Sequence, residues 1–468
     1  MKFTSTDIAN IVHGSLLLGT SNDVITGVST DSRTLQPGDL FVPLRGPNYD
    51  GHAYLRQAVE HGAAACLSEE IVGGLAVPVI QVGDALVALG ELAGNIRSNF
   101  DGSVFAITGT TGKTSTKEML ASILQRRTVG LKTEGNFNNL IGLPLTLARL
   151  NNEDCWMVLE LGMSSFGEIA RLARIAQPEI AIITNVGAGH LSGVGNVAGV
   201  ARAKGELFAS LTVGCSAIVN IDDSLVAALP LPEGVRRVTF GIEQNADVQA
   251  TDISSGRETS FTLHVAGVST SVTLPLPGRH QIYNALAAAA AASIIDVDIE
   301  EIAAGLAQVQ MAAQRLEVRE METGITILDD SYNANPQSMR AALTTLGDWP
   351  CSGRRIAVLA DMLELGDAAQ ECHREIGEIA GEKVDCLITM GQWADTVVQA
   401  SGFSASEALS THEAIAPNHS WGNRCCTIFF IRFTPNFRRC TFFASSLFAL
   451  YTPPSQLWCC RLSLVHGL

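Results

Sequence analysis

Residues 109–114 read Gly-Thr-Thr-Gly-Lys-Thr, a pattern whose residue types could hold a nucleotide phosphate. Backbone N–H groups at the start of a helix attract anions, and glycines let the backbone approach phosphate oxygens closely. In such a loop Lys113 would neutralise the β- and γ-phosphates, and the Thr114 hydroxyl would hold Mg²⁺. The residues that this pattern places around the phosphates are Gly109, Thr110, Thr111, Gly112, Lys113, Thr114 and Ser115.

The flanking residues predict a strand before this loop and a helix after it. The run 104–107 is apolar, and apolar side chains recur at helical spacing from Met119 to Leu124. The loop departs from the general phosphate-binding pattern, because Ile107 stands where the first glycine is expected and the loop is shorter. A plain glycine-rich turn is the alternative, but the Gly-Lys-Thr at the strand-to-helix junction favours phosphate binding.

Two further polar residues follow apolar runs that read as parallel strands. Glu160 ends the run that starts at Trp156, and His190 comes shortly after the run 180–184. Ligands bind at the carboxyl ends of such strands, so both residues are expected beside the phosphate loop. A carboxylate there could hold Mg²⁺, although it could also end the strand by chance. Magnesium prefers oxygen, so spacing alone leaves a structural role for His190 equally open.

Two other segments contain residues that could bind ligands or take part in catalysis, but each also has an ordinary structural explanation. Lys204 lies in the helical stretch 201–208, where a lysine is ordinarily a solvated surface charge. The segment 329–336 reads Asp-Asp-Ser-Tyr-Asn-Ala-Asn-Pro and is dense in side chains able to hold ribose, phosphate or an amine. Its alternative interpretation is a polar turn in which Asn335 or Asp330 caps the next helix.

The elements that must position these residues suggest an α/β protein of three domains, since 468 residues exceed what one core usually holds. Residues 1–82 read as a small α/β domain, and 83–312 as a central phosphate-loop domain with a parallel sheet covered on both faces. The strands expected in that sheet are Val104–Thr108, Trp156–Leu161, Ile180–Thr184 and Ala217–Asn220. The alanine-rich stretch 285–292 is expected to form a tightly packed helix.

Residues 313–416 read as a C-terminal Rossmann-like domain. Its expected strands are Ile325–Leu328, Ile356–Leu359 and Cys386–Thr389, with a helix over 336–346. From 417 to 468 the composition changes: this segment holds five of the eleven cysteines, seven of the seventeen phenylalanines and no Asp or Glu. We favour a translated frameshift for this aberrant segment over a metal or disulfide module, whose spacing it lacks, or a hydrophobic tail that associates with a partner or membrane.

Composition excludes several classes of protein. The net charge is −16 without a basic block, which argues against binding to nucleic acid or anionic lipid. The N-terminus lacks the apolar region of a secretory signal, and no apolar run is long enough to span a bilayer. The six cysteines before residue 417 lack metal-ligand spacing. We therefore expect a cytoplasmic enzyme, without membrane insertion and acting as a monomer.

Taken together, these motifs resemble those of the Mur ligases of peptidoglycan synthesis, over about residues 1–416. The motifs that carry the resemblance are Gly109–Thr114, Glu160-Leu161-Gly162, Gly189-His190-Leu191, Ala203-Lys204-Gly205-Glu206, Asn284, Arg315-Leu316-Glu317 and Asp329–Pro336. Within the family, segments 134–139, 329–335 and 361–366 resemble the member that acts last in the cytoplasm, on a UDP-N-acetylmuramoyl-tripeptide and D-alanyl-D-alanine.

The resemblance implies an ATP- and Mg²⁺-dependent amide synthesis through an acyl phosphate. It implies that Lys113, Lys204 and His190 serve catalysis, that Lys204 is carbamylated, and that Thr114, Glu160, His190 and Lys204 serve the metal sites. It further implies ATP contacts from Asn284, Arg315 and Asp330. The residues that it places near the other substrates are Asp31, Ser32 and Arg33 for the UDP group, and Asn136, Asn138, Asn139, Tyr332, Asn333 and Asn335.

One departure from the family concerns the C-terminus. The family's third domain normally finishes with a further strand and a Lys-Gly-Ser-Arg motif, and no such motif follows Ala416. We therefore expect the C-terminal domain to be incomplete, with an unpaired sheet edge and an uncovered apolar face, so that residues 313–416 fold poorly and the chain has little or no ligase activity. The alternatives are an inactive nucleotide-binding remnant, a neighbouring Mur ligase that adds a single amino acid, or a folylpolyglutamate synthase.

Overall fold

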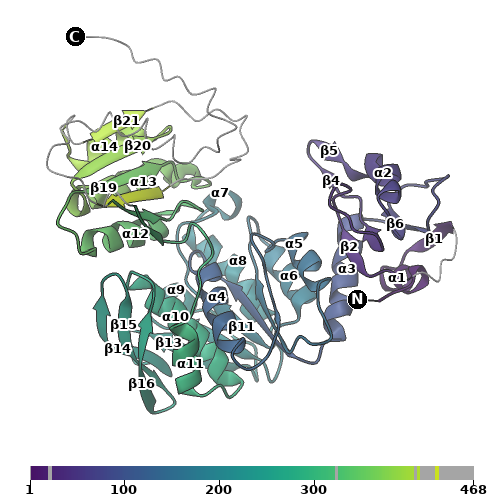
Figure 1. Cartoon of the computed structure of the whole chain (residues 1–468), viewed down its shortest axis with the longest axis horizontal. Coiled ribbons are helices and arrows are strands. Elements are labelled where there is room, and N and C mark those ends of the chain that lie inside the picture. The colour runs from purple at the N-terminus through teal and green to yellow at the C-terminus, as the bar shows by residue number, and fades with distance from the viewer. Residues whose placement is uncertain (1, 19–23, 322–324, 405–407, 412–426, 432–468) are drawn as a thin grey trace, which may run out of the picture. The chain divides into compact units, whose positions relative to one another are not determined.

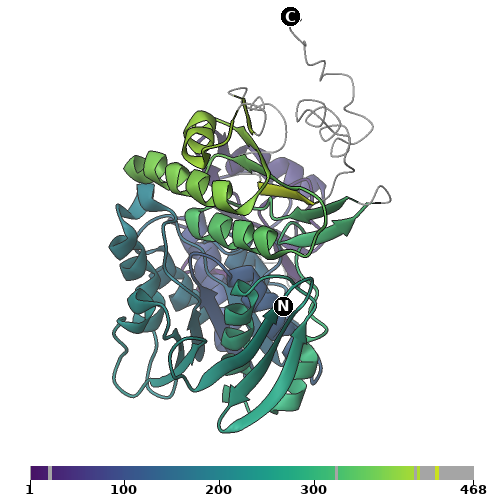
Figure 2. The ribbon, with the colours of Figure 1, turned by 90° about the vertical axis from the view of Figure 1, so that its left-hand side faces the viewer.

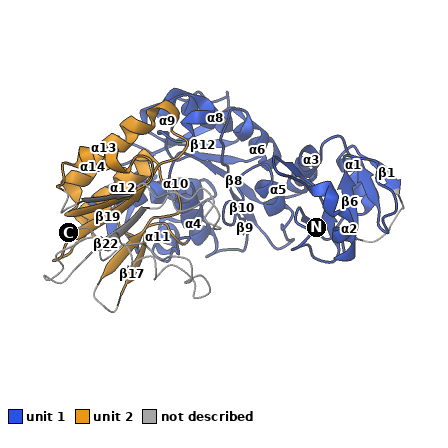
Figure 3. Ribbon diagram, turned by 90° about the horizontal axis from the view of Figure 1, so that it is seen from above, with its two compact units in different colours: residues 1–254, 258–275, 279–312 blue, residues 255–257, 276–278, 313–468 orange. Residues whose placement is uncertain are grey.

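The computed structural model describes residues 2–18, 24–321, 325–404, 408–411 and 427–431 (Figure 1). The chain divides into two compact units, which Figure 3 shows in different colours. Unit 1 comprises residues 1–254, 258–275 and 279–312, and unit 2 comprises 255–257, 276–278 and 313–468. Among the described residues, no helix combines the length and apolar character needed to cross a membrane.

The N-terminal part of unit 1 is a five-stranded sheet in the order β1-β7-β6-β3-β2, with only β1 antiparallel to its neighbour. Its strands, with the separate hairpin β4–β5, are β1 (Ser15–Leu18), β2 (Gly27–Ser29), β3 (Asp39–Phe41), β4 (Arg45–Gly46), β5 (Tyr49–Asp50), β6 (Ala65–Ser68) and β7 (Val79–Gln81). Its helices are α1 (Ser5–Ile11), η1 (Gly51–Tyr54), α2 (Leu55–Glu60) and α3 (Ala85–Ser98). Ile8, Leu40 and Ile80 pack in one core with Leu92 of α3, so this helix belongs to the same hydrophobic cluster.

The larger part of unit 1 is a nine-stranded sheet in the order β16-β15-β14-β13-β12-β11-β8-β10-β9. Its strands are β8 (Ser103–Thr108), β9 (Leu131–Lys132), β10 (Trp156–Glu160), β11 (Ile180–Ile183), β12 (Ser216–Asn220), β13 (Arg236–Gly241), β14 (Val248–Ser255), β15 (Thr259–Val265) and β16 (Val268–Leu274). The strands from β9 to β14 pair in parallel, whereas β15 and β16 form the antiparallel hairpin drawn in teal near the bottom of Figure 2. The four strands predicted for this sheet are confirmed.

The helices of this part cover the sheet and bury it. They are α4 (Lys113–Leu124), α5 (Gly142–Leu147), α6 (Glu168–Ala176), α7 (Leu191–Val194), α8 (Val197–Ala209), α9 (Ser224–Ala227), α10 (His280–Ile294) and α11 (Ile299–Leu306). Every residue of β10, β11 and β12 is buried, as a parallel sheet covered on both faces requires. Ala285–Ala292 lie fully buried in α10, which packs on α4, so the prediction of a tightly packed helix is confirmed.

Unit 2 contains a six-stranded sheet in the order β17-β18-β22-β19-β20-β21. Its strands are β17 (Glu317–Glu320), β18 (Thr326–Asp329), β19 (Arg355–Ala360), β20 (Cys386–Met390), β21 (Ala408–Thr411) and β22 (Thr427–Ile431). Its helices are α12 (Pro336–Asp348), η2 (Gly366–Ala368), α13 (Ala369–Lys383) and α14 (Ala394–Ser401). The predicted strands and the helix over 336–346 are therefore present.

One strand of this sheet comes from the predicted aberrant segment 417–468. Thr427–Ile431 form β22, which lies between β18 and β19 and pairs antiparallel with both. The remainder of that segment lies outside the described residues. That the last part of the sheet is lost stays a prediction. The backbone of Thr427–Ile431 nevertheless occupies a position inside the sheet.

Candidate active site

The loop Gly109–Gly112 joins β8 to α4, as the sequence predicts. Gly112 has a φ of +79°, and a Cβ atom there would lie 2.2 Å from Asn284 Oδ1. A Cβ atom at Gly109 would lie 1.8 Å from Thr184 Oγ1. Neither position tolerates a side chain, so the loop depends on its glycines to place backbone N–H groups at the start of α4.

Two residues that follow β11 hold this loop in shape. The Thr111 N–H donates to Asn185 Oδ1 at 2.9 Å, and the Thr110 N–H donates to the Asn185 carbonyl at 3.0 Å. Thr184 Oγ1 donates to the Thr111 carbonyl at 2.6 Å. The protein's own hydrogen bonds therefore hold the loop in shape, and a preorganised loop lowers the entropic cost of binding a ligand.

Two lysines converge on one carbonyl of the loop. Lys113 Nζ donates to the Gly109 carbonyl at 2.8 Å, and Lys204 Nζ donates to the same oxygen at 2.9 Å. Lys204 in α8 is only 2% exposed, so the sequence-based interpretation of it as a solvated surface charge is wrong. Burial, together with the nearby charge of Lys113, lowers the pKa of Lys204 well below its usual value.

Glu160 ends β10 in register with Ile107 of β8, which places it beside the phosphate loop. Its carboxylate is 3% exposed and accepts a hydrogen bond from Thr114 Oγ1 at 3.0 Å. Asn138 Nδ2 donates to the other carboxylate oxygen, also at 3.0 Å. Three of the predicted site residues, Thr114, Asn138 and Glu160, therefore lie together.

The other predicted residues of unit 1 lie around this centre. Asn284 is buried in α10 beside Gly112 and accepts from Thr116 Oγ1 at 3.5 Å. His190 immediately precedes α7 with a φ of +57°. The Thr110 hydroxyl accepts from the Gly187 N–H at 2.9 Å, so the segment that leads to His190 contacts the phosphate loop.

Two residues of the asparagine-rich segment 136–139 have local roles. Asn139 Oδ1 accepts from the N–H groups of Ile141 and Gly142, at the start of α5. The Asn136 carbonyl accepts from the Asn138 N–H at 2.8 Å. Ser115 is buried in the first turn of α4.

In the N-terminal part of unit 1, the predicted substrate residues form a turn between β2 and β3, in which Arg33 is exposed. Hydrogen bonds from the Arg33 side chain and N–H lower the pKa of Asp31 to about 2. Ser32 is buried and donates to Gln57 Oε1 at 3.1 Å. The charges of Asp31 and Arg33 are directed at each other, and Ser32 anchors the turn to α2.

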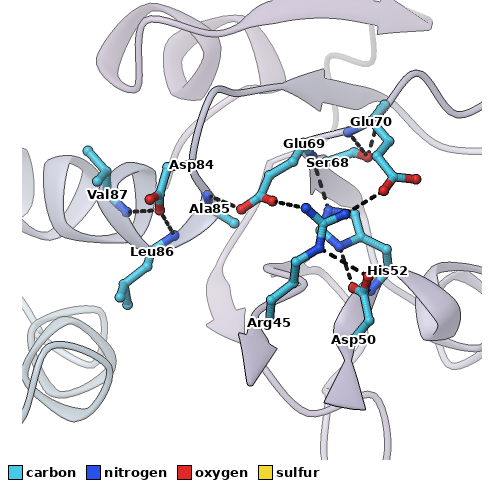
Figure 4. Close-up of polar contacts among 10 residues, drawn as sticks. All are labelled: Arg45, Asp50, His52, Ser68, Glu69, Glu70, Asp84, Ala85, Leu86 and Val87. Carbon is cyan, nitrogen blue, oxygen red and sulfur yellow. Dashed lines mark hydrogen bonds and ion pairs between the residues drawn. The ribbon is translucent and has the colours of Figure 1, made fainter. Parts of the chain in front are cut away.

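A larger polar network ties the β4–β5 hairpin to α3 (Figure 4). Arg45 forms ion pairs with Asp50, Glu69 and Glu70. Glu69 Oε1 accepts from the Ala85 N–H at 2.9 Å, which is the first N–H of α3. Hydrogen bonds from His52, and then from Arg45, lower the pKa of Asp50 to about 2. This network holds the hairpin in position. The predictions from sequence did not include its residues.

In unit 2, Arg315 precedes β17, and the other predicted residues follow β18. The Arg315 guanidinium lies 4.0 Å from the centre of the Tyr332 ring. Burial raises the pKa of Asp330 to about 6, which the charge of Arg315 opposes, and the Leu316 N–H donates to Asp330 at 3.2 Å. Asp330 is therefore not a cap of α12.

The neighbouring asparagines make short-range contacts. Asn335 caps α12 in a reciprocal arrangement with Ser338, so the capping alternative is confirmed for this residue. Asn333 Oδ1 accepts from the Ala334 N–H at 2.9 Å. Both side chains thereby fix the backbone between β18 and α12.

The segment 361–366 follows β19 and is held by its own unit. Asp361 accepts from the N–H groups of Gln392 and Trp393, at 2.7 and 3.0 Å. His373 Nε2 accepts from the Met362 N–H at 2.9 Å, and its other ring nitrogen lies 2.6 Å from the Ala369 carbonyl. Burial lowers the pKa of His373, which favours the neutral ring that this arrangement needs.

Comparisons with known proteins match the chain to one family. Three family descriptions match the chain: "Mur ligase family, catalytic domain" over residues 24–97, "Mur ligase middle domain" over 107–292, and "Mur ligase, glutamate ligase domain" over 314–418. The Escherichia coli UDP-N-acetylmuramoyl-tripeptide--D-alanyl-D-alanine ligase is 40% identical over 419 residues, which are 88% of this chain and 92% of the relative. The chain belongs to the Mur ligase family.

Solved Mur ligases share the fold. The chain superimposes on a crystal structure of MurF from Acinetobacter baumannii with a TM-score of 0.83 and 33% identity, over 88% of this chain and 90% of that one. A MurF ligase from Thermotoga maritima in complex with ADP gives a TM-score of 0.73 and 27% identity, over 82% and 88% of the two chains. The protein therefore has the three-domain α/β fold of this ligase.

The donor set of this Mur ligase suits a hard cation. Thr114 supplies a hydroxyl and Glu160 a carboxylate at 3.0 Å from each other, and oxygen ligands of this kind are what Mg²⁺ prefers. Among the described residues, no group of three or more His, Cys, Asp or Glu side chains could hold a metal ion. Mg²⁺ usually keeps water and phosphate oxygens and takes only one or two carboxylates, so this sparse donor set fits it.

Several residues of this Mur ligase site were missed from the sequence. Thr184 and Asn185 shape the phosphate loop, Thr133 contacts the Glu160 backbone, and Glu206 accepts from the N–H groups of Gly167 and Ala170. Glu206 belongs to the quoted Lys204 motif, so its motif could have suggested a role. The others are uncharged and carry no pattern of their own.

Proposed function

We propose that this protein is an ATP-dependent amide ligase that joins D-alanyl-D-alanine to a UDP-N-acetylmuramoyl-tripeptide in peptidoglycan precursor synthesis. One structural observation carries the chemistry: Lys113 and Lys204 meet at Gly109, beside the Thr114–Glu160 pair, at one edge of a parallel sheet. The substrates are inferred from the name of the Escherichia coli relative, and the nucleotide from the ADP complex of the Thermotoga maritima enzyme.

The reaction has two steps. The terminal carboxylate of the tripeptide attacks the γ-phosphorus of ATP, ADP leaves, and an acyl phosphate forms. The amine of D-alanyl-D-alanine then attacks the acyl carbon, loses a proton, and inorganic phosphate leaves. Activation is needed because a carboxylate oxygen is a poor leaving group and phosphate is a good one.

The phosphate loop supplies positioning and charge. The N–H groups at the start of α4 would bind the phosphates, and Lys113 would balance charge on the transferring oxygens. Thr114, Glu160 and His190 would hold Mg²⁺, which neutralises phosphate charge and aligns the γ-phosphate with the carboxylate. Since Lys113 now donates to the Gly109 carbonyl, its ammonium group would exchange that contact for a phosphate oxygen.

We propose that Lys204 is carbamylated, as in the family. Its low pKa favours the neutral amine, which can add to CO₂ with loss of one proton and form a carbamate. The buried neutral amine would thereby become an anion able to help position a second Mg²⁺. Its burial in α8 next to Lys113 supports this assignment, because an anion there would pair with the Lys113 charge.

The remaining predicted residues are assigned to substrates by resemblance. We assign Asn284, Arg315 and Asp330 to ATP, with Arg315 on the phosphates and Asp330 on the ribose. The residues assigned to the other substrates are Asp31, Ser32, Arg33, Asn136, Asn138, Asn139, Tyr332, Asn333 and Asn335. We expect the protein to act in the cytoplasm as a monomer.

A phosphate-release assay with the full chain tests the proposal. With ATP, Mg²⁺ and the UDP-linked tripeptide, phosphate should be released when D-alanyl-D-alanine is added, and single amino acids should be poor acceptors. Turnover with a single amino acid and none with the dipeptide would instead identify a neighbouring ligase.

A second candidate is a nucleotide-binding protein without ligase activity. The observation that favours it is that the family match ends at residue 418, before any Lys-Gly-Ser-Arg motif. In that case ATP and Mg²⁺ should raise the melting temperature, while no phosphate appears with complete substrates. Brisk turnover would eliminate this candidate.

A further inference from the structure

A buried charged cluster lies behind the phosphate loop and has no part in the chemistry assigned above. Lys117 of α4 is 2% exposed, and its ammonium lies 2.9 Å from Glu118 Oε1. Lys132 of β9 pairs with the other oxygen of Glu118 and is about one-third exposed. Burying an ammonium group is costly unless it is well paired. Lys117 shares Glu118 with Lys132, so its other hydrogen-bond partner also matters.

A second contact of Lys117 connects it, through Thr133, to Glu160 of the candidate active site. Lys117 Nζ donates to the Thr133 carbonyl at 2.6 Å. The Thr133 N–H in turn donates to the Val158 carbonyl of β10 at 3.1 Å, and its hydroxyl accepts from the Glu160 N–H at 3.0 Å. Thr133 is fully buried, so these three hydrogen bonds are shielded from water.

The segment that begins at Thr133 also reaches the Glu160 carboxylate. Asn138, five positions further along, donates to Glu160 Oε1, while Thr114 donates to Oε2. Two contacts of Glu160, one to its backbone and one to its side chain, thus come from a segment whose first residue is held by Lys117. This arrangement links a buried charge on α4 to the orientation of the carboxylate.

We propose that Lys117 is a positioning residue for the metal and phosphate site. By holding the Thr133 backbone in place, Lys117 fixes the position and orientation of Glu160 relative to Thr114 and the phosphate loop. The inference rests on the proposed function, in which Glu160 helps to hold Mg²⁺. It predicts that losing Lys117 weakens the cation site and leaves the binding of nucleotide alone intact.

The test compares Lys117→Met with Lys132→Met in the full chain. Both variants remove one lysine from Glu118, but the Lys117 ammonium also donates to the Thr133 carbonyl, whereas the Lys132 ammonium pairs with Glu118. Mn²⁺ is titrated in the presence of ADP and followed by electron paramagnetic resonance, and ADP affinity is measured separately in EDTA. Loss of a residue that orients a metal ligand typically weakens metal binding about 10- to 100-fold. We expect Lys117→Met to show a loss of about tenfold in Mn²⁺ affinity at unchanged ADP affinity, and Lys132→Met to stay within about twofold.

A second variant keeps the test decisive if Lys117→Met does not fold. Thr133→Val removes the hydroxyl that accepts from Glu160 but retains the carbonyl that accepts from Lys117. It should weaken Mn²⁺ binding in the same direction, and the double variant should lose less than the sum of the two single effects. Equal Mn²⁺ affinities for the Lys117→Met and Lys132→Met proteins, or an unaffected Thr133→Val protein if Lys117→Met is unfolded, would overturn the inference.

The proposed function can fail independently of this inference. If the wild-type chain binds Mn²⁺ with ADP but releases no phosphate, the ligase assignment fails while the metal titration still decides the role of Lys117. If the wild-type chain is active and the variants bind Mn²⁺ normally, only the inference about Lys117 fails.

Discussion

The carboxyl ends of the strands in unit 1 and in unit 2 both carry many polar residues, but these residues do different work. In unit 1, Thr114 and Glu160 meet each other, and two lysines share the carbonyl of a loop residue that tolerates no side chain. In unit 2, Asp361, which follows β19, accepts hydrogen bonds from two backbone N–H groups of its own unit. A polar residue at the end of a strand is therefore not by itself a ligand-binding residue.

The comparison also separates two kinds of buried charge. Lys204 is buried with a carbonyl partner and a second lysine nearby, an arrangement that disfavours its charged form. Asp330 is buried, and the charge of Arg315 offsets only part of the cost of ionising it. Its ionised form is therefore also disfavoured. Ionisable groups whose pKa values are shifted in this way are common at functional sites. In contrast, the Asp361 carboxylate has backbone donors for both oxygens.

The largest effect is expected at the phosphate loop. Lys113→Met should lower the rate of phosphate release about 10²- to 10³-fold, because it removes a preorganised positive charge from the transferring phosphate. Arg126→Met, just beyond the other end of α4, is the matched control and should keep its activity. A Lys113→Met protein with more than a tenth of wild-type turnover would place the site elsewhere.

The glycines of the loop should come next. Gly109→Ala would bring a Cβ atom within 1.8 Å of Thr184 Oγ1, so we expect a loss of about 1–3 kcal/mol in the free energy of unfolding and weaker ADP binding. In Gly94→Ala, the new Cβ meets nothing within 4 Å in the interior of α3, and stability should rise by about 0.5–1 kcal/mol. Urea unfolding of both variants checks this difference, and equal stabilities would contradict it.

Two carboxylates of unit 2 should respond in opposite ways. Asp361→Ala leaves two backbone N–H groups without their acceptor, so stability should fall by about 1–3 kcal/mol at unchanged ADP affinity. Asp330→Asn removes a carboxylate whose folded pKa of about 6 exceeds the unfolded value of 3.8, so its ionisation costs stability as the pH rises from 3.8 to about 6, and the full cost remains above pH 6. This variant should be at least as stable as the wild type at pH 8 while binding ADP more weakly in calorimetry. If both variants lose stability and keep ADP affinity, Asp330 belongs with the structural carboxylates.

The smallest effect concerns His373 and pH. Burial lowers its folded-state pKa below the usual histidine value of 6.5, so the neutral ring favours the native state. That contribution is fully present above pH 6.5 and is lost as the pH falls from there through the lower folded-state pKa. The wild-type protein should therefore lose more stability over this range than His373→Gln, which does not titrate and retains an acceptor for the Met362 N–H. Parallel pH profiles of urea midpoints for the two proteins would show that this ring does not control the segment 361–366.

Much of the fold follows from local patterns. Apolar runs predicted strands β8, β10, β11 and β12, because a strand buried on both faces needs apolar residues throughout. Helical spacing predicted α4 and α12. The sequence could not assign a place to Thr427–Ile431, because a strand inside a sheet takes its position from partners far away in the chain.

Only part of the candidate site could be predicted from the sequence. The phosphate loop and Glu160 have recognisable positions relative to their strands, and the structure brings Thr114, Asn138 and Glu160 together. Thr184 and Asn185 were missed, since polar residues after a strand are common and nothing local distinguishes a loop support. The roles of His190 and the substrate residues stay predictions.

The sequence alone determined the order of strands, loops and helices and the presence of a phosphate loop, because these depend on residues that are neighbours in the chain. Only the tertiary structure decided that Lys204 is buried, since its partner Gly109 lies 95 residues away. The same holds for Lys117, whose contact with Thr133 requires α4 and the segment before Asn138 to pack together. Burial and hydrogen-bond partners set the charge state of a lysine, and both are properties of the packed fold.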